Sequence, residues 1–145
     1  MTTTVRQILA GRAGVYMVSP DDTIFDALRL MAEKNIGAVL VMSGGAIAGI
    51  VSERDYARKV VLLGRTSKTT PVRDIMTTDV VSVEPGWTAD QCMALMTDQR
   101  IRHLPVVENG ALVGIVSIGD ISTNTNADNK VGKAIESISE APPNN

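Results

Sequence analysis

The feature that most constrains this chain is a heptad that occurs twice. Gly49-Ile50-Val51-Ser52-Glu53-Arg54-Asp55 returns 65 residues later as Gly114-Ile115-Val116-Ser117-Ile118-Gly119-Asp120. In each copy a glycine precedes a β-branched run, a serine ends the run, and an aspartate follows three residues after the serine. This order predicts a strand, a turn and the start of a helix.

The two heptads belong to a longer internal repeat. Residues 16–56 align without a gap on residues 81–121, and 14 of the 41 aligned positions are identical. Upstream, residues 5–9 (Val-Arg-Gln-Ile-Leu) resemble residues 72–76 (Val-Arg-Asp-Ile-Met). Two copies are too few for a solenoid, so we expect a pseudo-symmetric pair of repeats packed into one module.

Each repeat has the pattern β-α-β-β-α, which predicts an α/β fold of the α+β type. Thr23 and Thr88 each begin a capping box, and Gly44-Gly45 and Asn109-Gly110 have the composition of tight hairpin turns. A second helix is expected at residues 53–63, without a comparable apolar helix in the second repeat. The predicted strands are 16–18, 38–42 and 47–51 in the first repeat and 80–83, 104–107 and 112–116 in the second.

The repeats and the composition of the ends define the expected domain boundaries. We place the first repeat at residues 1–66, which includes the N-terminal segment, and the second at residues 67–122. Residues 123–145 are polar, could carry a short helix, and end in a segment that we expect to be disordered.

Composition excludes several classes of function. Fourteen basic residues against sixteen acidic ones give a net charge of −2, and only 3% of residues are aromatic, so we expect no nucleic-acid partner. The lone Cys92 cannot form an internal disulfide, and we expect it to be a small buried apolar residue. No run of 18 apolar residues and no apolar signal core is present, so we expect a cytoplasmic protein without a membrane partner.

The heptad has two interpretations. Ser52 with Asp55, and Ser117 with Asp120, form capping boxes that explain the pattern without a ligand. However, a hydroxyl, an acid able to accept two ribose hydroxyls, and free N–H groups at a helix start would together suit a nucleotide. The residues alone leave both interpretations open.

The duplicated pattern resembles a known family. Pro20 and Pro85 precede the first helix of each repeat, Leu104-Pro105-Val106 ends a strand, and each repeat closes with Gly-h-h-Ser-x-x-Asp, in which h is apolar. This combination resembles a tandem CBS domain pair, also called a Bateman module, over residues 5–121. The stretches 52–60, 101–106 and 114–120 further resemble a stand-alone bacterial and organellar subgroup.

The resemblance implies a regulatory module that binds adenine nucleotides in clefts between the two repeats. The implied ligands are AMP, ADP, ATP or NAD(H), with S-adenosylmethionine less favoured. Asp55 and Asp120 would take ribose hydroxyls, and Ser52 and Ser117 would lie near phosphate or ribose. The main chain around four residues would hold adenine: Val18, Ile36, Val83 and Ile101. The candidates for phosphate charge are Arg54, Arg102 and His103.

Differences between the copies predict two unequal sites, of which the Asp120 site is the first to test. His103 is open to two interpretations, a phosphate contact or a plain surface residue. As the only histidine, without a Cys or acid cluster at ligand spacing, it does not indicate a metal site. No catalytic constellation is present either, so we expect no enzymatic activity. The resemblance further implies a homodimer that acts on an unidentified regulated protein. The rival hypothesis is a ligand-independent dimeric interaction scaffold with vestigial clefts.

Overall fold

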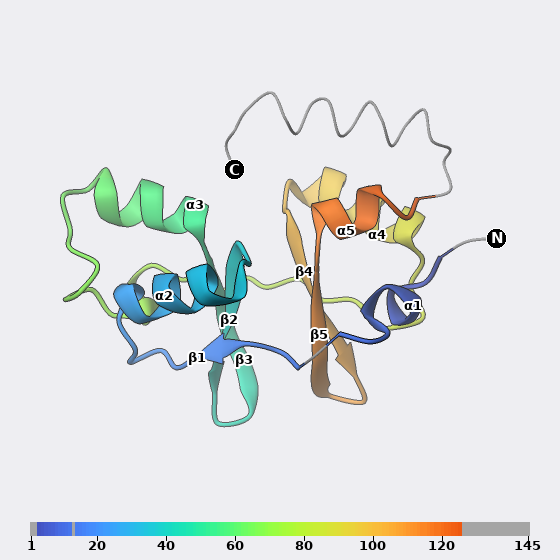
Figure 1. The fold of residues 1–145 in the computed structure, drawn as a ribbon, viewed down its shortest axis with the longest axis horizontal. Coiled ribbons are helices and arrows are strands. Elements are labelled where there is room, and N and C mark those ends of the chain that lie inside the picture. Colours follow the sequence, from blue (N-terminus) through green and yellow to red (C-terminus); the bar gives the residue numbers. More distant parts are fainter. Residues whose placement is uncertain (1–2, 13, 126–145) are drawn as a thin grey trace. The chain divides into compact units, whose positions relative to one another are not determined.

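The computed structural model describes residues 3–12 and 14–125, and these residues fall into two compact units. One unit, the first-repeat unit, comprises residues 16–80. The other, the second-repeat unit, joins the described parts of residues 1–15 and 81–145. Mixed helices and sheets confirm the predicted α+β fold (Figure 1). The expected short helix and disordered end of the tail lie outside the described residues.

The compact units differ from the expected division at residues 66 and 67. The first fifteen residues group with the second repeat, and residues 67–80 group with the first. The physical reason is an exchange of apolar anchors: Val5 is fully buried in the core of the second-repeat unit, and Val72 is fully buried in the core of the first-repeat unit. Domain boundaries drawn at single points along the sequence cannot represent this exchange.

The first-repeat unit contains a three-stranded sheet of order β1-β2-β3, in which β1 is parallel to β2 and β2 is antiparallel to β3. The expected helix at 53–63 is present as a short α-helix followed by a π-helix. The elements are β1 (Met17–Val18), α2 (Ile24–Lys34), β2 (Ala38–Ser43), β3 (Ala46–Ser52), α3 (Glu53–Tyr56), the π-helix η1 (Ala57–Val61) and the 3-10 helix η2 (Val72–Asp74).

The second-repeat unit is built on the antiparallel hairpin β4–β5. The strand expected at residues 80–83 is reduced to an isolated parallel bridge between Val83 and Val106. Figure 1 shows α1 beside β5 of this hairpin. The elements are α1 (Val5–Leu9), α4 (Ala89–Gln99), β4 (His103–Glu108), β5 (Ala111–Ser117) and α5 (Ile118–Ser122).

Local sequence signals account for the ends of these elements. Thr23 and Thr88 accept backbone N–H groups at the starts of α2 and α4, and both predicted capping boxes are present. Gly44-Gly45 and Asn109-Gly110 all have positive φ, as the turns that join twisted hairpins require. Cys92 is fully buried, as predicted, and burial raises the pKa of its thiol to about 11.

The heptad glycines are needed for packing. A Cβ added at Gly114 would lie 2.7 Å from Cδ1 of Leu9, and one added at Gly49 would lie 2.8 Å from the carbonyl oxygen of Thr77. Each glycine therefore lets a residue that follows an anchor approach a strand closely: Leu9, after Val5, approaches β5, and Thr77, after Val72, approaches β3. The space that the missing side chains leave is filled by other residues of the same chain, so packing alone accounts for both glycines and no ligand is needed to explain them.

Candidate functional site

The candidate site consists of two junctions, one in each unit, where a strand passes into a short helix. At the junction of β3 and α3, the Ser52 N–H donates to Oδ2 of Asp55 (2.9 Å) and the Asp55 N–H donates to Oγ of Ser52 (3.1 Å). At the junction of β5 and α5, the corresponding distances between Ser117 and Asp120 are 2.8 and 3.1 Å. Both heptads are therefore reciprocal capping boxes, as predicted.

Few backbone N–H groups at these junctions are left to bind an anion. The Glu53 N–H donates to the carbonyl oxygen of Gly37 (3.1 Å), and the Ile118 N–H donates to that of Arg102 (2.8 Å). Together with the serine and aspartate N–H groups, three donors at each junction already have acceptors. The sequence-based expectation of free N–H groups at these helix starts was therefore wrong for most of them.

Asp120 forms a two-point ion pair with Arg12, which lies in the segment after α1. Nη2 of Arg12 lies 2.7 Å from Oδ1 of Asp120, and Nη1 lies 3.2 Å from Oδ2. The Asp120 side chain is 25% exposed and that of Arg12 is 42% exposed. A planar guanidinium on both oxygens of a carboxylate is the geometry that gives arginine its preference for such groups.

These contacts set the protonation of Asp120. Half-burial alone would raise the pKa of this carboxyl, but the hydrogen bonds from Arg12 and from the Ser117 N–H, together with the charge of Arg12, lower it below the usual 3.8. Asp120 is therefore an anion at neutral pH. Because its folded pKa is lowered, the stabilisation from this pairing is present above the ordinary aspartate pKa and is lost as pH falls through the folded value.

Replacing Arg12 by glutamine is expected to raise the pKa of Asp120, because burial then acts with less compensation. The measurement is an NMR titration of the Asp120 carboxyl carbon from neutral to acidic pH. Arg6→Gln is the matched control, since Arg6 pairs with Glu108 in the same unit (2.9 Å) and should leave the Asp120 titration unchanged. An unchanged midpoint in Arg12→Gln would contradict the assigned role of the ion pair.

Asp55 has a different cation. Nζ of Lys59, four residues further along, lies 3.2 Å from Oδ1 of Asp55 and also donates to the carbonyl oxygen of Ile75 (3.1 Å). The Asp55 side chain is 16% exposed. Lys59 lies in the π-helix η1, a helix type that is frequent at functional positions. Both junctions thus present a partly buried carboxylate that the chain has already neutralised.

The remaining predicted phosphate contacts lie at the same ends of the strands. His103 is the register partner of Ser117 and is half-buried, and Arg102 is joined to the α5 start through its carbonyl oxygen. In the second-repeat unit these two residues, Ser117 and Asp120 therefore come together. Arg54 is exposed in the first turn of α3.

The four residues expected to hold adenine mainly pack against the cores. Val18 and Val83 are buried, with 8% and 2% exposure, and the Val83 main chain bonds to Pro105 and Val107 of β4. Ile36 and Ile101 are half-buried against the two cores. Their placement beside a ligand stays a prediction.

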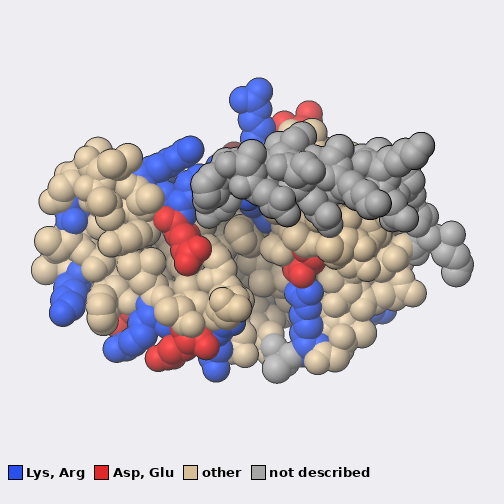
Figure 2. All heavy atoms as spheres, turned by 45° about the horizontal axis from the view of Figure 1, so that its top comes forward, with Lys and Arg blue, Asp and Glu red and all other residues tan. Residues whose placement is uncertain are grey.

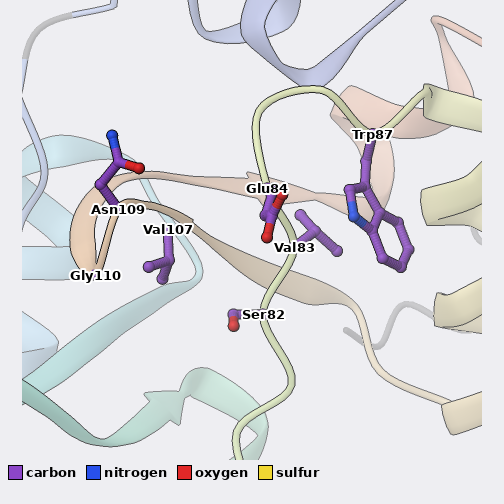
Figure 3. Close-up of a pocket in the computed structure, with 7 residues that line it drawn as sticks. All are labelled: Ser82, Val83, Glu84, Trp87, Val107, Asn109 and Gly110. Atoms are coloured by element: carbon purple, nitrogen blue, oxygen red, sulfur yellow. The ribbon is translucent and has the colours of Figure 1, made fainter.

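A pocket of about 380 Å³ lies in the second-repeat unit (Figure 3). Asn109 and Gly110 of the β4–β5 turn line it, whereas the junction lies at the opposite end of the hairpin. Among the predicted site residues, only Val83 lines this pocket. The full lining is Ser82, Val83, Glu84, Trp87, Val107, Asn109 and Gly110.

Where Figure 2 shows the described residues, basic and acidic side chains are interspersed. Within residues 3–12 and 14–125, no group of three or more His, Cys, Asp or Glu side chains could hold a metal ion. No helix in that same part of the chain is long and apolar enough to cross a membrane.

Sequence reasoning missed the two cations that contact the aspartates. A signal for Lys59 existed, because an acid and a lysine four residues apart can pair along a helix. No signal existed for Arg12, which is 108 residues away from Asp120 in the chain. Only the packing of α1 in the second-repeat unit brings Arg12 to the junction.

Comparison with known proteins places the repeats in a family. The model of the CBS domain matches residues 5–62 and 72–124. The CBS domain-containing protein CBSX3, mitochondrial, from Arabidopsis thaliana is 47% identical over 106 residues. The match covers 70% of this chain and 52% of that relative, so the chain spans about half the length of CBSX3.

Solved structures that resemble this chain also contain CBS domains. A protein from Burkholderia ambifaria MC40-6, described as a signal-transduction protein with CBS domains, is 54% identical, with a TM-score of 0.81 and coverage of 88% of this chain and 96% of that one. A hexameric CBS-CP12 protein from bloom-forming cyanobacteria is 28% identical, with a TM-score of 0.78 and coverage of 97% and 85%. Structural neighbours of this chain therefore include self-associating proteins.

An enzyme also contains a related segment. The inosine-5'-monophosphate dehydrogenase of Nitrosopumilus maritimus is 36% identical over 116 residues, which cover 79% of this chain and 23% of that enzyme. The similarity thus covers about a quarter of the enzyme's length.

Proposed function

Because this chain belongs to the CBS domain family, we propose that it is a regulatory module that binds adenine nucleotides at its two strand-to-helix junctions. Pairs of CBS domains are generally regulatory and often bind nucleotides or act in signalling. The proposed ligands are AMP, ADP, ATP or NAD(H). Ligand occupancy would shift an equilibrium between forms of the module, to the extent that affinity differs between those forms.

The observation that carries this proposal is the equivalent aspartate at both junctions. Asp55 and Asp120 are each fixed by a capping box and each keep part of the carboxylate exposed beside a cation. A carboxylate held in this way can accept the two hydroxyls of a ribose, and the adjacent cation can meet a phosphate. Arg54, Arg102 and His103 remain proposed as further phosphate contacts.

Asp55→Ala and Asp120→Ala are each expected to weaken nucleotide binding by about 10- to 150-fold at the altered junction. This range corresponds to the loss of charge-assisted hydrogen bonds of about 1.5 to 3 kcal/mol. The measurement is calorimetric titration of each variant with AMP, ATP and NADH.

Asp26→Ala provides the matched control for this test. Asp26 completes the capping box of α2 in the same way, with its Oδ2 3.1 Å from the Thr23 N–H, but it lies outside the heptads. Asp26→Ala should lose the carboxylate half of this capping box and keep nucleotide affinity. Unchanged affinity in both heptad variants would rule out the proposed sites.

The second candidate function is a ligand-independent dimeric scaffold. One observation favours it: Val61, Leu62 and Leu63 at the end of η1 are 52%, 75% and 67% exposed, which makes them an apolar surface suited to self-association. A thermal-shift screen separates the two candidates, since a nucleotide that binds the folded chain raises its melting temperature. If the melting temperature rose with none of the four nucleotides AMP, ADP, ATP and NADH, the scaffold would be favoured.

A further inference from the structure

We infer that Arg12 makes the Asp120 junction selective for phosphorylated nucleosides over adenosine itself. The inference rests on the proposed function, because it concerns the class of ligand at one of the two proposed sites. It assigns a specificity role to a residue that lies outside both heptads.

Arg12 and the Ser117 N–H together take three of the about four acceptor positions of the Asp120 carboxylate. The two terminal nitrogens of Arg12 contact both carboxylate oxygens of Asp120, at 2.7 and 3.2 Å, and Oδ2 also accepts the Ser117 N–H. A ribose diol must therefore displace at least one of the two Arg12 contacts. Its hydroxyls also form charge-assisted hydrogen bonds with the carboxylate, but they carry no positive charge and do not replace the ion pair.

The displaced guanidinium stays near the junction. The Arg12 N–H donates to the carbonyl oxygen of Leu9 (3.1 Å), and Leu9 packs where Gly114 leaves room on β5. Val5 is fully buried in the same core and fixes the start of α1. The backbone of Arg12 is therefore held near β5, and Nη1 also donates to the carbonyl oxygen of Ile115 on that strand (3.5 Å).

A phosphate gives Arg12 an anionic partner in place of the Asp120 carboxylate that the ribose takes. The guanidinium fork that fits a carboxylate also fits a phosphate, so a nucleotide gives Arg12 a new partner as it takes the old one. Adenosine supplies no anion and leaves the cation unpaired. A ligand with a positive charge near the ribose, such as a sulfonium nucleoside, would be disfavoured further by repulsion.

The other junction lacks this arrangement. In the alignment of residues 5–9 with 72–76, the position of Arg12 corresponds to Asp79. Asp55 is instead held by one nitrogen of Lys59 at 3.2 Å, and that ammonium is shared with a backbone carbonyl. Lysine is a point charge without the planar fork. The strong phosphate requirement is therefore expected at Asp120.

The test uses an Asp55→Ala background, in which binding at the other junction is weakened, so that the Asp120 junction dominates the titration. AMP and adenosine are titrated by calorimetry into this parent, into Arg12→Gln and into Arg12→Lys. In the parent, AMP should bind about 10-fold or more tightly than adenosine. In Arg12→Gln the adenosine affinity should rise and the AMP affinity fall, so that the ratio approaches one. Arg12→Lys should give an intermediate ratio.

An AMP-to-adenosine ratio that stays the same in Arg12→Gln would overturn the inference while leaving the proposed function in place. Failure of the proposed function looks different: AMP would bind neither the unaltered chain nor the parent, or would bind with an affinity indifferent to Asp120→Ala. Melting curves of the variants confirm folding, which should be retained because the ion pair is partly open to solvent, with Arg12 42% exposed, and such pairs contribute about 1 kcal/mol or less to stability.

Discussion

Val5→Asp is expected to unfold the second-repeat unit. Val5 is fully buried with Val83, Cys92 and Leu104, so the new carboxylate would lie in an apolar core without a partner. Such a change costs about 4 kcal/mol or more, which is most of the stability of a typical small unit. Hydrogen exchange followed by mass spectrometry should show lost protection in residues 81–125.

The same experiment tests the composition of the units. Ala10→Asp, at an exposed position one residue after α1, is the matched control and should leave protection nearly unchanged. Val72→Asp should act on residues 16–80 instead, because Val72 is buried in the core of that unit. If Val5→Asp removed protection first from residues 16–80, the exchange of anchors would be wrong.

Gly49→Ala is expected to destabilise the first-repeat unit by about 3 kcal/mol, the upper end of the usual range for overpacking. The added Cβ would lie 2.8 Å from the carbonyl oxygen of Thr77, which accepts the Ile50 N–H (3.0 Å). Relief of this clash would require the backbone bridge between β3 and the segment after η2 to open. Urea denaturation followed by circular dichroism measures the loss.

Gly114→Ala is the matched substitution at the equivalent position, and it should cost less. Its Cβ would meet the methyl groups of Leu9, at 2.7 and 2.9 Å, and the end of a leucine side chain can turn away. Gly114→Ala with Leu9→Ala should therefore recover part of the loss relative to the sum of the single changes. Equal losses for the two glycine variants would contradict the difference between a backbone and a side-chain obstacle.

Signals close together in the sequence predicted the elements well. The boxes at Thr23, Thr88, Ser52 and Ser117 and the two hairpin turns were confirmed, because hydrogen bonds over three residues and positive φ depend on the local residues alone. The prediction of a strand at 80–83 was wrong, because strand formation does not depend on local residues alone. Its pairing depends on what lies beside it, and only Val83 forms a bridge to β4.

The candidate site was predictable in part. The sequence identified Asp55 and Asp120 as equivalent carboxylates at strand-to-helix junctions, and the structure places them there. It named Arg54, Arg102 and His103 as candidates for phosphate charge, which stays a prediction. It did not identify Lys59 and Arg12, which form the ion pairs with the two aspartates. An ion pair between residues 108 positions apart cannot be recognised from the local sequence pattern around either residue.

The sequence by itself determined the family, the internal repeat and the capping role of each heptad, since all three depend on residue identity and spacing. The tertiary structure alone decided which core Val5 and Val72 each join, and therefore that Arg12 faces Asp120. The physical reason is that Val5 and Val72 gain stability from burial in any apolar core that fits them, and their sequence does not specify which one. The exchange of these anchors puts Arg12 on Asp120 and makes the two junctions unequal.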